Sequence, residues 1–146
     1  MNYENISGLI SKLSADLNWV IPLSVTQRII PYCKMGMSNQ KLPVYEKFRL
    51  GGSISLPGYN RDELWGNHFI VLGILYRIEI LKQMNVQFNF TLGSVYEKYQ
   101  NFRWNNLSSG VSGGILALSP VGPIGLYYGR NENKRDILYL SIGYEF

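Results

Sequence analysis

The sequence contains very little cysteine and little charge, and each shortage excludes a class of protein. Cys33 is the only cysteine in 146 residues, so the chain can form no internal disulfide and offers no cysteine cluster for a metal. Charged residues make up 16% of the chain and are spread along it, so the net charge of +4 gives no basic footprint for a nucleic acid. We expect no nucleic-acid partner and no cofactor.

Long hydrophobic runs are also missing. The longest apolar run, residues 69–76, is far shorter than the ~20 residues that a membrane-spanning helix needs. Residues 1–10 contain neither the basic region nor the apolar core of a secretory signal. We therefore expect no transmembrane helix and no signal peptide, and we interpret the chain as a fragment of a longer protein or as a reading frame that begins at an internal Met.

Aromatic residues and glycine are abundant instead. Eleven Tyr, six Phe, three Trp and fifteen Gly are typical of a protein rich in strands and turns. Apolar and polar residues alternate with a period of two in seven stretches, which are residues 9–21, 26–37, 68–81, 86–96, 109–118, 123–130 and 137–146. The sequence therefore predicts an all-β fold of antiparallel strands.

The length of these stretches and the order of their connections indicate a membrane barrel. At about 9–14 residues they are longer than ordinary globular strands and match the strands that cross a bilayer at a tilt. Short and long connections alternate along the chain, which is typical of an up-and-down transmembrane β-barrel with short periplasmic turns and longer external loops.

Alternation also assigns the two faces of the predicted barrel wall. A polar face expected to line the lumen carries Lys12, Asp16, Arg28, Lys34, Arg77, Glu79 and Gln87. An apolar face expected to meet lipid includes Ile70, Leu72, Ile74, Leu138, Leu140 and Ile142. Aromatic residues near strand ends are expected to form interfacial belts, and they are Trp19, Tyr32, Tyr76, Tyr128, Tyr144 and Phe146.

Residues 48–66, between two predicted strands, form the stretch around which we expect the rest of the chain to be organised. We expect this stretch to be a long structured loop. Its glycines permit backbone angles that other residues resist, and Pro57 fixes the backbone just before the Gly58-Tyr59 step. Loops of this length are uncommon in compact domains and usually carry function. A plain surface loop remains the alternative.

Several motifs together suggest a family. They are FRLGG at 48–52, LPGY at 56–59, YRIE at 76–79, GSVYE at 93–97, GPIGLYYG at 122–129 and GYEF at 143–146. This set resembles the C-terminal barrel of the bacterial surface antigen superfamily, which includes the outer-membrane assembly factors BamA and TamA. The similarity is closest to the barrel that follows a patatin-like phospholipase domain.

The resemblance implies that the loop, residues 38–67, folds back into the lumen of a 16-stranded barrel. Its lumenal motif would comprise Phe48, Arg49, Gly51, Gly52, Pro57, Gly58 and Tyr59, and Arg77 and Glu79 would lie on the lumenal wall. The assembly factors carry an Arg before the Gly-aromatic step, held by acidic partners, and this chain has Pro57 there. That departure favours the patatin-linked branch over an insertase.

Arg77 and Glu79 are interpreted as lumen-facing charges. The alternatives are pairing with neighbouring residues or with charges of the loop, which are Arg61, Asp62 and Glu63.

The sequence also contains a G-x-S-x-G match at residues 110–114, centred on Ser112. A nucleophile elbow needs a strand-to-helix turn, and no helical pattern follows this serine. The only histidine, His68, begins a predicted strand, and Asp136 falls in a charged loop. We therefore predict no catalytic residue, and small residues here are expected to let a loop approach the wall.

Residues 1–146 are thus interpreted as one domain, the last seven strands of a 16-stranded barrel in the bacterial outer membrane. The barrel would anchor, or help to expose or translocate, an N-terminal patatin-like passenger. Its expected partners are outer-membrane lipid, the remaining strands of the same barrel and the outer-membrane assembly machinery. The alternatives are an insertase, a soluble ligand-binding barrel and a hydrolase that uses Ser112.

The end of the chain gives a first prediction. Tyr144 and Phe146 end the apolar face of the last strand, and such an ending resembles the signal by which the assembly machinery takes up its clients. A strand with a free edge binds by β-augmentation. We predict that replacing both residues with Ser, or deleting Phe146, slows outer-membrane insertion of the parent protein and leaves its synthesis unchanged.

Pulse-chase labelling of the heat-modifiable folded form measures this rate. If Phe146 is only an interfacial anchor, assembly will proceed at the parental rate and the finished barrel will melt earlier, which would contradict the targeting role.

Overall fold

The protein is one curved antiparallel sheet with a short hairpin packed against it. The structure, a computed structural model, describes residues 11–98, 100 and 103–143. The main strands run in the order β1 (Lys12–Asn18), β3 (Gln27–Ser38), β6 (His68–Leu81), β7 (Met84–Tyr96), β8 (Ser108–Ser119), β9 (Gly122–Asn131) and β10 (Asp136–Ile142). The short strand β2 (Ile21–Pro22) pairs with β3, and β4 (Phe48–Leu50) pairs with β5 (Leu64–Gly66). The 3-10 turn η2 is Trp104–Asn106.

The prediction of an all-β antiparallel fold is confirmed, and most predicted strands match within one or two residues. The first differs, because the predicted strand 9–21 is interrupted between β1 and β2, and residues 9 and 10 lie outside the described part of the chain. The register runs on unchanged, with Asn18 opposite Tyr32 and Ile21 opposite Ile29. The interruption therefore falls opposite Pro31, which has no N–H to complete the ladder.

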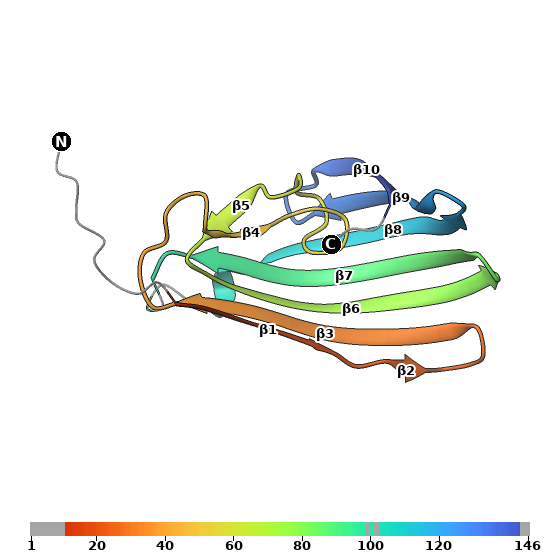
Figure 1. Ribbon diagram of the computed structural model, residues 1–146, viewed down its shortest axis with the longest axis horizontal. Helices are drawn as coiled ribbons and strands as arrows, with labels where there is room; N and C mark the ends of the chain where they lie inside the picture. The colour runs from red at the N-terminus through yellow and green to blue at the C-terminus, as the bar shows by residue number, and fades with distance from the viewer. Residues whose placement is uncertain (1–10, 99, 101–102, 144–146) are drawn as a thin grey trace.

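Short and long connections alternate as predicted. Residues 82–83 and 120–121 form tight turns at one end of the sheet, and residues 39–67 and 97–107 form the long connections at the other (Figure 1). The charged loop is residues 132–135, two residues shorter than the expected 131–136, because Asn131 pairs with Gly110 in β8 and Asp136 pairs with Arg130 in β9. Long loops therefore gather at one end.

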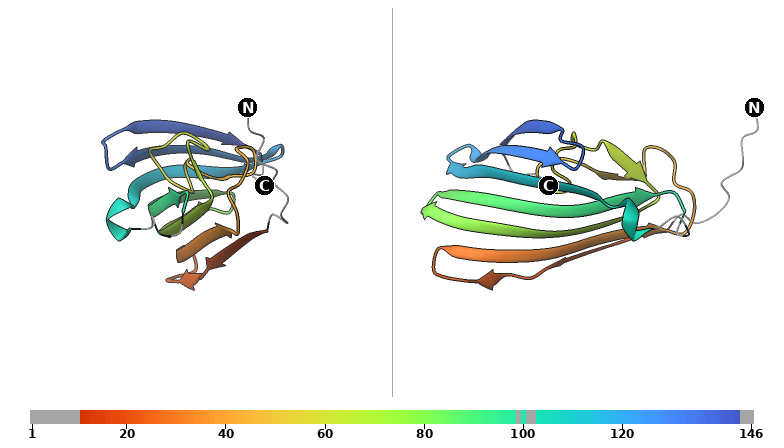
Figure 2. Two further views of the ribbon diagram at one scale, coloured as in Figure 1. Left: turned by 90° about the vertical axis from the view of Figure 1, so that its left-hand side faces the viewer. Right: turned by 180° about the vertical axis from the view of Figure 1, so that it is seen from behind.

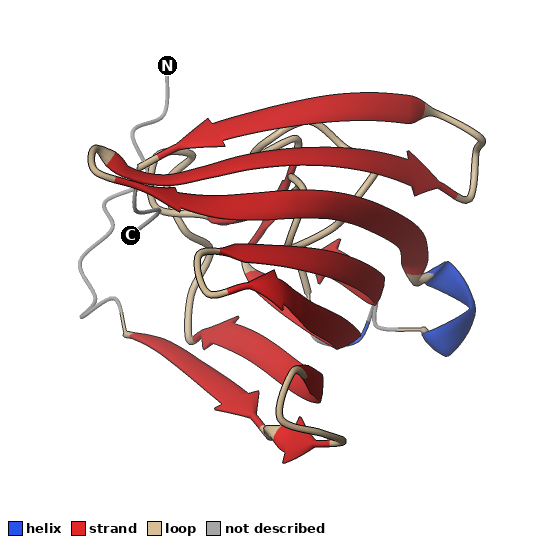
Figure 3. Ribbon diagram, turned by 90° about the vertical axis from the view of Figure 1, so that its right-hand side faces the viewer, coloured by secondary structure: helices blue, strands red, loops and turns tan. Residues whose placement is uncertain are grey.

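The sheet is curved, and the hairpin lies inside the curve. Viewed along the strands, β1 to β10 form an open trough with the 39–67 connection in its hollow (Figures 2 and 3). In the part of the chain that the structure describes, β1 and β10 are the two edges and are not paired with each other. We call the inner side the concave face and the outer side the convex face. Residues 48–66, from β4 to β5, are called the fold-back segment.

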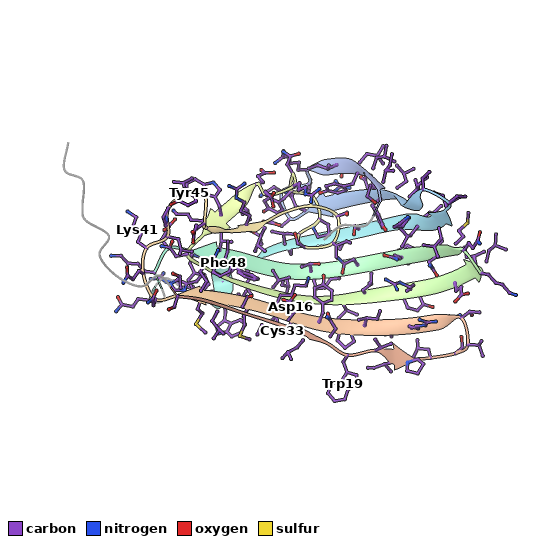
Figure 4. All side chains as sticks on the ribbon, viewed as in Figure 1. Asp16, Trp19, Cys33, Lys41, Tyr45 and Phe48 are labelled. Carbon is purple, nitrogen blue, oxygen red and sulfur yellow. The ribbon has the colours of Figure 1, made fainter. Side chains whose placement is uncertain are left out.

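The two faces reverse the usual distribution of polarity. The convex face exposes large apolar side chains, including Leu138, Leu140 and Ile142 at 68% each, and Trp19 points away from the sheet in Figure 4. Buried polar residues lie on the concave face, and they include Gln87, Asn89, Thr91, Ser112 and Asn131. Soluble monomeric proteins rarely expose a large contiguous apolar surface, and such a surface typically marks a face that contacts lipid or another protein. Among the described residues, no helix is long and apolar enough to cross a membrane.

One aromatic prediction is wrong. Tyr32 was expected in an interfacial belt, but it is 8% exposed and lies on the concave face with Leu50 and Val71 in the small buried core. Gly73, its partner across β3 and β6, leaves room for the ring, because a Cβ there would overlap it. Tyr144 and Phe146 lie outside the described residues.

The convex face generates a second prediction. Leu140 pairs with Leu126 in the middle of β9 and is fully directed outward, so Leu140→Arg should destabilise a membrane-inserted barrel by ~2–4 kcal/mol. Val121, which is exposed in the tight turn after β8, is the matched control, and Val121→Arg should cost less than about 1 kcal/mol. Urea unfolding in lipid vesicles measures both values. Equal costs at the two positions would contradict a bilayer centred on the middle of the strands.

Candidate functional site: a fold-back segment bound on the concave face

The fold-back segment has a tightly constrained backbone. Gly51, Gly52 and Gly58 have φ values of 131°, 107° and 81°, which glycine adopts far more easily than other residues. The Ser55 hydroxyl donates to the Gly51 carbonyl oxygen at 2.7 Å, and Gly52 and Leu56 form an isolated bridge. The segment is therefore a compact turn rather than a linker, held at its base by pairing between β4 and β5.

Polar side chains of the sheet bind the first part of this turn. The carbonyl oxygen of Ile54 lies 3.1 Å from the Tyr32 hydroxyl and 3.0 Å from Asn89 Nδ2. The Tyr32 hydroxyl also lies 2.8 Å from that of Thr91. These residues come from β3 and β7, which lie on either side of β6, so two strands hold one loop carbonyl through a buried polar network.

The next residues pack closely against β8 and β9. Leu56 and Pro57 are fully buried. A Cβ at Gly110 in β8 would overlap the Pro57 carbonyl oxygen, and a Cβ at Gly129 in β9 would lie 3.0 Å from the Gly58 nitrogen. The expectation that small residues let a loop approach the wall is therefore confirmed. Pro57 is held by close packing against these glycines, and its uncharged side chain forms no ion pair.

Tyr139 and Asn131 clamp the Gly58-Tyr59 step. The Gly58 N–H donates to the Tyr139 hydroxyl oxygen at 2.9 Å, and that hydroxyl donates to the Tyr59 carbonyl oxygen at 2.6 Å. Asn131 Nδ2 donates to the Gly58 carbonyl oxygen at 3.0 Å, while its Oδ1 accepts from the Asn133 and Arg135 N–H groups. Asn131 thus joins the fold-back segment to the loop between β9 and β10.

That loop also supplies the charged contacts of the segment. The Tyr59 hydroxyl donates to Glu132 Oε1 at 2.6 Å, and Arg135 Nη1 lies 2.6 Å from Glu63 Oε1. The hydrogen bond from the Asn60 N–H is the largest effect on the pKa of Glu63 and lowers it. Desolvation acts in the opposite direction, and the hydrogen bond and charge of Arg135 lower the pKa further, so it lies below its usual value. Desolvation raises the pKa of Glu132, but the hydrogen bonds from Tyr59 and main-chain N–H groups outweigh it and lower that pKa. Because both folded-state pKa values are lowered, these contacts are present at neutral pH and are lost in acid.

The remaining motif residues take separate places. Phe48 packs on Phe69 with ring centroids 5.0 Å apart, and Arg49 is exposed. Arg77 and Glu79 lie on the concave face, where Glu79 Oε2 is 3.8 Å from Arg28 Nη2. Pairing of Arg77 or Glu79 with Arg61, Asp62 or Glu63 does not occur among the described residues.

The geometry of Ser112 does not suit a nucleophile. It lies in the middle of β8, opposite Asn89, with no strand-to-helix turn after it. Its hydroxyl donates to the Ser53 carbonyl oxygen at 2.9 Å and is buried under the segment. His68 is at the start of β6, opposite Tyr96, far along the ladder from this serine.

Sequence reasoning missed the side chains that hold the segment, which are Asn89, Asn131, Glu132, Arg135 and Tyr139. The alternation of Gln87, Asn89 and Thr91 along β7 marked a polar face, but no sequence signal showed which of these residues meets a loop carbonyl. The loop between β9 and β10 looked like an ordinary charged turn.

The family model described as "Omp85 superfamily domain" matches residues 5–146. No curated protein is significantly similar to the chain in sequence.

The clamp generates a third prediction. Tyr139→Phe removes the acceptor of the Gly58 N–H and the donor to the Tyr59 carbonyl oxygen, which leaves buried main-chain groups unpaired. The expected loss of stability is ~1–3 kcal/mol, with faster proteolysis of residues 51–63. Tyr128→Phe is the matched control, because that convex-face hydroxyl bonds only to exposed Asp136 and should change stability by less than about 0.5 kcal/mol. Unfolding midpoints and limited proteolysis of the folded protein test both, and an equal response would contradict the clamp.

Proposed function

The chain belongs to the Omp85 superfamily, whose domains are outer-membrane β-barrels of the assembly and secretion family, and we propose that it is the C-terminal part of such a barrel carrying a passenger. In this proposal the strands anchor an N-terminal patatin-like domain in the bacterial outer membrane and help to expose or translocate it. The concave face becomes the lumen, and residues 38–67 fold into it.

The observation that carries the proposal is the locked fold-back segment. Its main chain is bound by side chains of β3, β7, β8, β9 and β10. Because the segment is fixed at several points, in this proposal it does not move out of the lumen. It forms part of the barrel wall and narrows the lumen. The convex apolar face supports lipid contact. In the described part of the chain the outer edges of β1 and β10 are unpaired, which supports pairing with remaining strands of the same barrel, because open edges are not tolerated in lipid.

The alternative function is that of an outer-membrane protein assembly factor. It is favoured by the family itself and by the free edge of β10, which offers main-chain groups to a client strand. The shape-based packing of Pro57, in place of an ion pair at that position, favours the passenger barrel.

A surface-exposure experiment tests the proposal. In cells that make the full-length protein with an epitope tag on its N-terminal domain, the tag should be in the outer-membrane fraction and accessible to antibody on intact cells. Deleting residues 5–146 should leave the tag inside the cell. Exposure without those residues would contradict the passenger role. Depletion that lowers the folded yield of unrelated outer-membrane barrels would identify the assembly factor instead.

Lipase activity gives a separate prediction. If the parent hydrolyses phospholipids, Ser112→Ala should leave turnover unchanged, because the hydroxyl only donates to the Ser53 carbonyl oxygen. A chromogenic ester assay on the detergent-solubilised protein measures turnover, with the heat-modifiable gel shift as the control for folding. Lost turnover in a folded variant would show that Ser112 is a nucleophile.

A further inference from the structure

A second polar site lies on the concave face, at the end with the tight turns. It is a small pocket lined by Thr26, Arg28, Arg77, Glu79, Lys82 and Asn85, which we call the turn-end pocket. It is separate from the fold-back segment. On β7, Asn85 lines the pocket near the turn. Asn89, which holds the segment, is four residues further along the strand, beyond Gln87.

Like charges face each other across this pocket. Arg28 on β3 is directly opposite Arg77 on β6, and directly opposed like charges destabilise a sheet. Lys82, in the adjacent turn, adds a third positive charge, whereas Glu79 is the single carboxylate of the lining. Glu79 is already engaged, since it lies 3.8 Å from Arg28. The pocket therefore carries an uncompensated positive charge.

Two buried donors beside the pocket have no acceptor. Within the described part of the chain, Arg77 Nε and Gln87 Nε2 are buried and make no hydrogen bond. Gln87 is 4% exposed and directly opposite Arg77 in the ladder, so the two side chains are neighbours. A buried donor left unpaired costs free energy comparable to a lost hydrogen bond, and more when the group is charged.

The size and chemistry of the pocket indicate which class of ligand it suits. The pocket volume is about 120 Å³, which is roughly four times the ~30 Å³ that one water molecule occupies in the liquid. Such a volume is sufficient for a compact anion such as a phosphate group. Guanidinium groups match the oxygens of a phosphate group in forked pairs, and Lys82 adds a point charge.

We propose that the turn-end pocket is a phosphate-binding site, with Arg77 as its central donor, Arg28 and Lys82 as flanking cations and Gln87 as a neutral donor. Bound phosphate would relieve the repulsion between Arg28 and Arg77 and satisfy Arg77 Nε. The phosphate group belongs either to a lipid headgroup at the membrane surface or to a soluble phosphate ester that enters the lumen. This site goes beyond the passenger role, and we expect its loss to leave membrane anchoring intact, because its lining lies on the concave face, away from the apolar convex face.

Titration of the full-length protein in detergent micelles with inorganic phosphate, at low ionic strength, tests the proposal by calorimetry. Arg77→Gln should weaken binding by about tenfold or more, since a hydrogen bond to a charged group is lost. Glu79→Gln should strengthen binding, because it removes the only competing negative charge of the lining. Arg130→Gln is the matched control, since that guanidinium pairs with exposed Asp136 on β10 and should leave phosphate affinity unchanged.

The source of the phosphate is found by competition. A short-chain phosphatidic acid that displaces phosphate far better than glycerol 3-phosphate identifies a lipid, and equal displacement identifies a soluble ester; both support the site. Should Arg77→Gln fail to give the heat-modifiable folded form, the stronger binding of Glu79→Gln still decides. No measurable phosphate binding by the parent, or equal affinity in the parent and in folded Arg77→Gln and Glu79→Gln variants, overturns the proposal.

Discussion

The structure depends on how the main chain of the fold-back segment obtains its hydrogen bonds. Residues 53–59 lie against a sheet whose own main-chain groups are already paired, so only side chains of that sheet can bind them. The polar residues of the concave face follow from this need. Asn89, Ser112, Asn131 and Tyr139 each meet one or two main-chain groups of the segment, and the glycines of β8 and β9 allow the approach.

The same need explains the reversed polarity of the wall. Each strand must present polar side chains to the segment and apolar side chains to the opposite side, because neighbouring residues of a strand point to opposite faces. Placing Asn89 and Thr91 inward thus places Phe88 and Phe90 outward, where they are about half exposed. Domains of the family are outer-membrane β-barrels, and an apolar outer face is suited to contact with a bilayer.

The strands and their faces were predictable because a period of two fixes both at once, whereas the binding of the fold-back segment was not. Gly58 and Tyr139 are 81 positions apart, and no local pattern relates a loop N–H to a hydroxyl at that distance.

Two features that differ from the prediction were already indicated by the sequence. Tyr32 shares its face with Arg28 and Lys34, so alternation already directed it inward, and Pro31 already marked where β1 would lose its ladder. Asp136 joined β10 because its pairing with Arg130 outweighs its low strand propensity.

The contacts of Tyr139 also have a consequence for the order of folding. Tyr139 lies on the last described strand, and the partners of residues 53–59 begin at Tyr32 on β3. The segment is synthesised before β6 to β10, yet its binding site is complete only after β10 has joined β9. Closing contacts over so long a stretch of chain is slow, and until then the segment stays exposed. The moment at which the segment becomes protected from protease during biogenesis would therefore report when β10 has paired with β9.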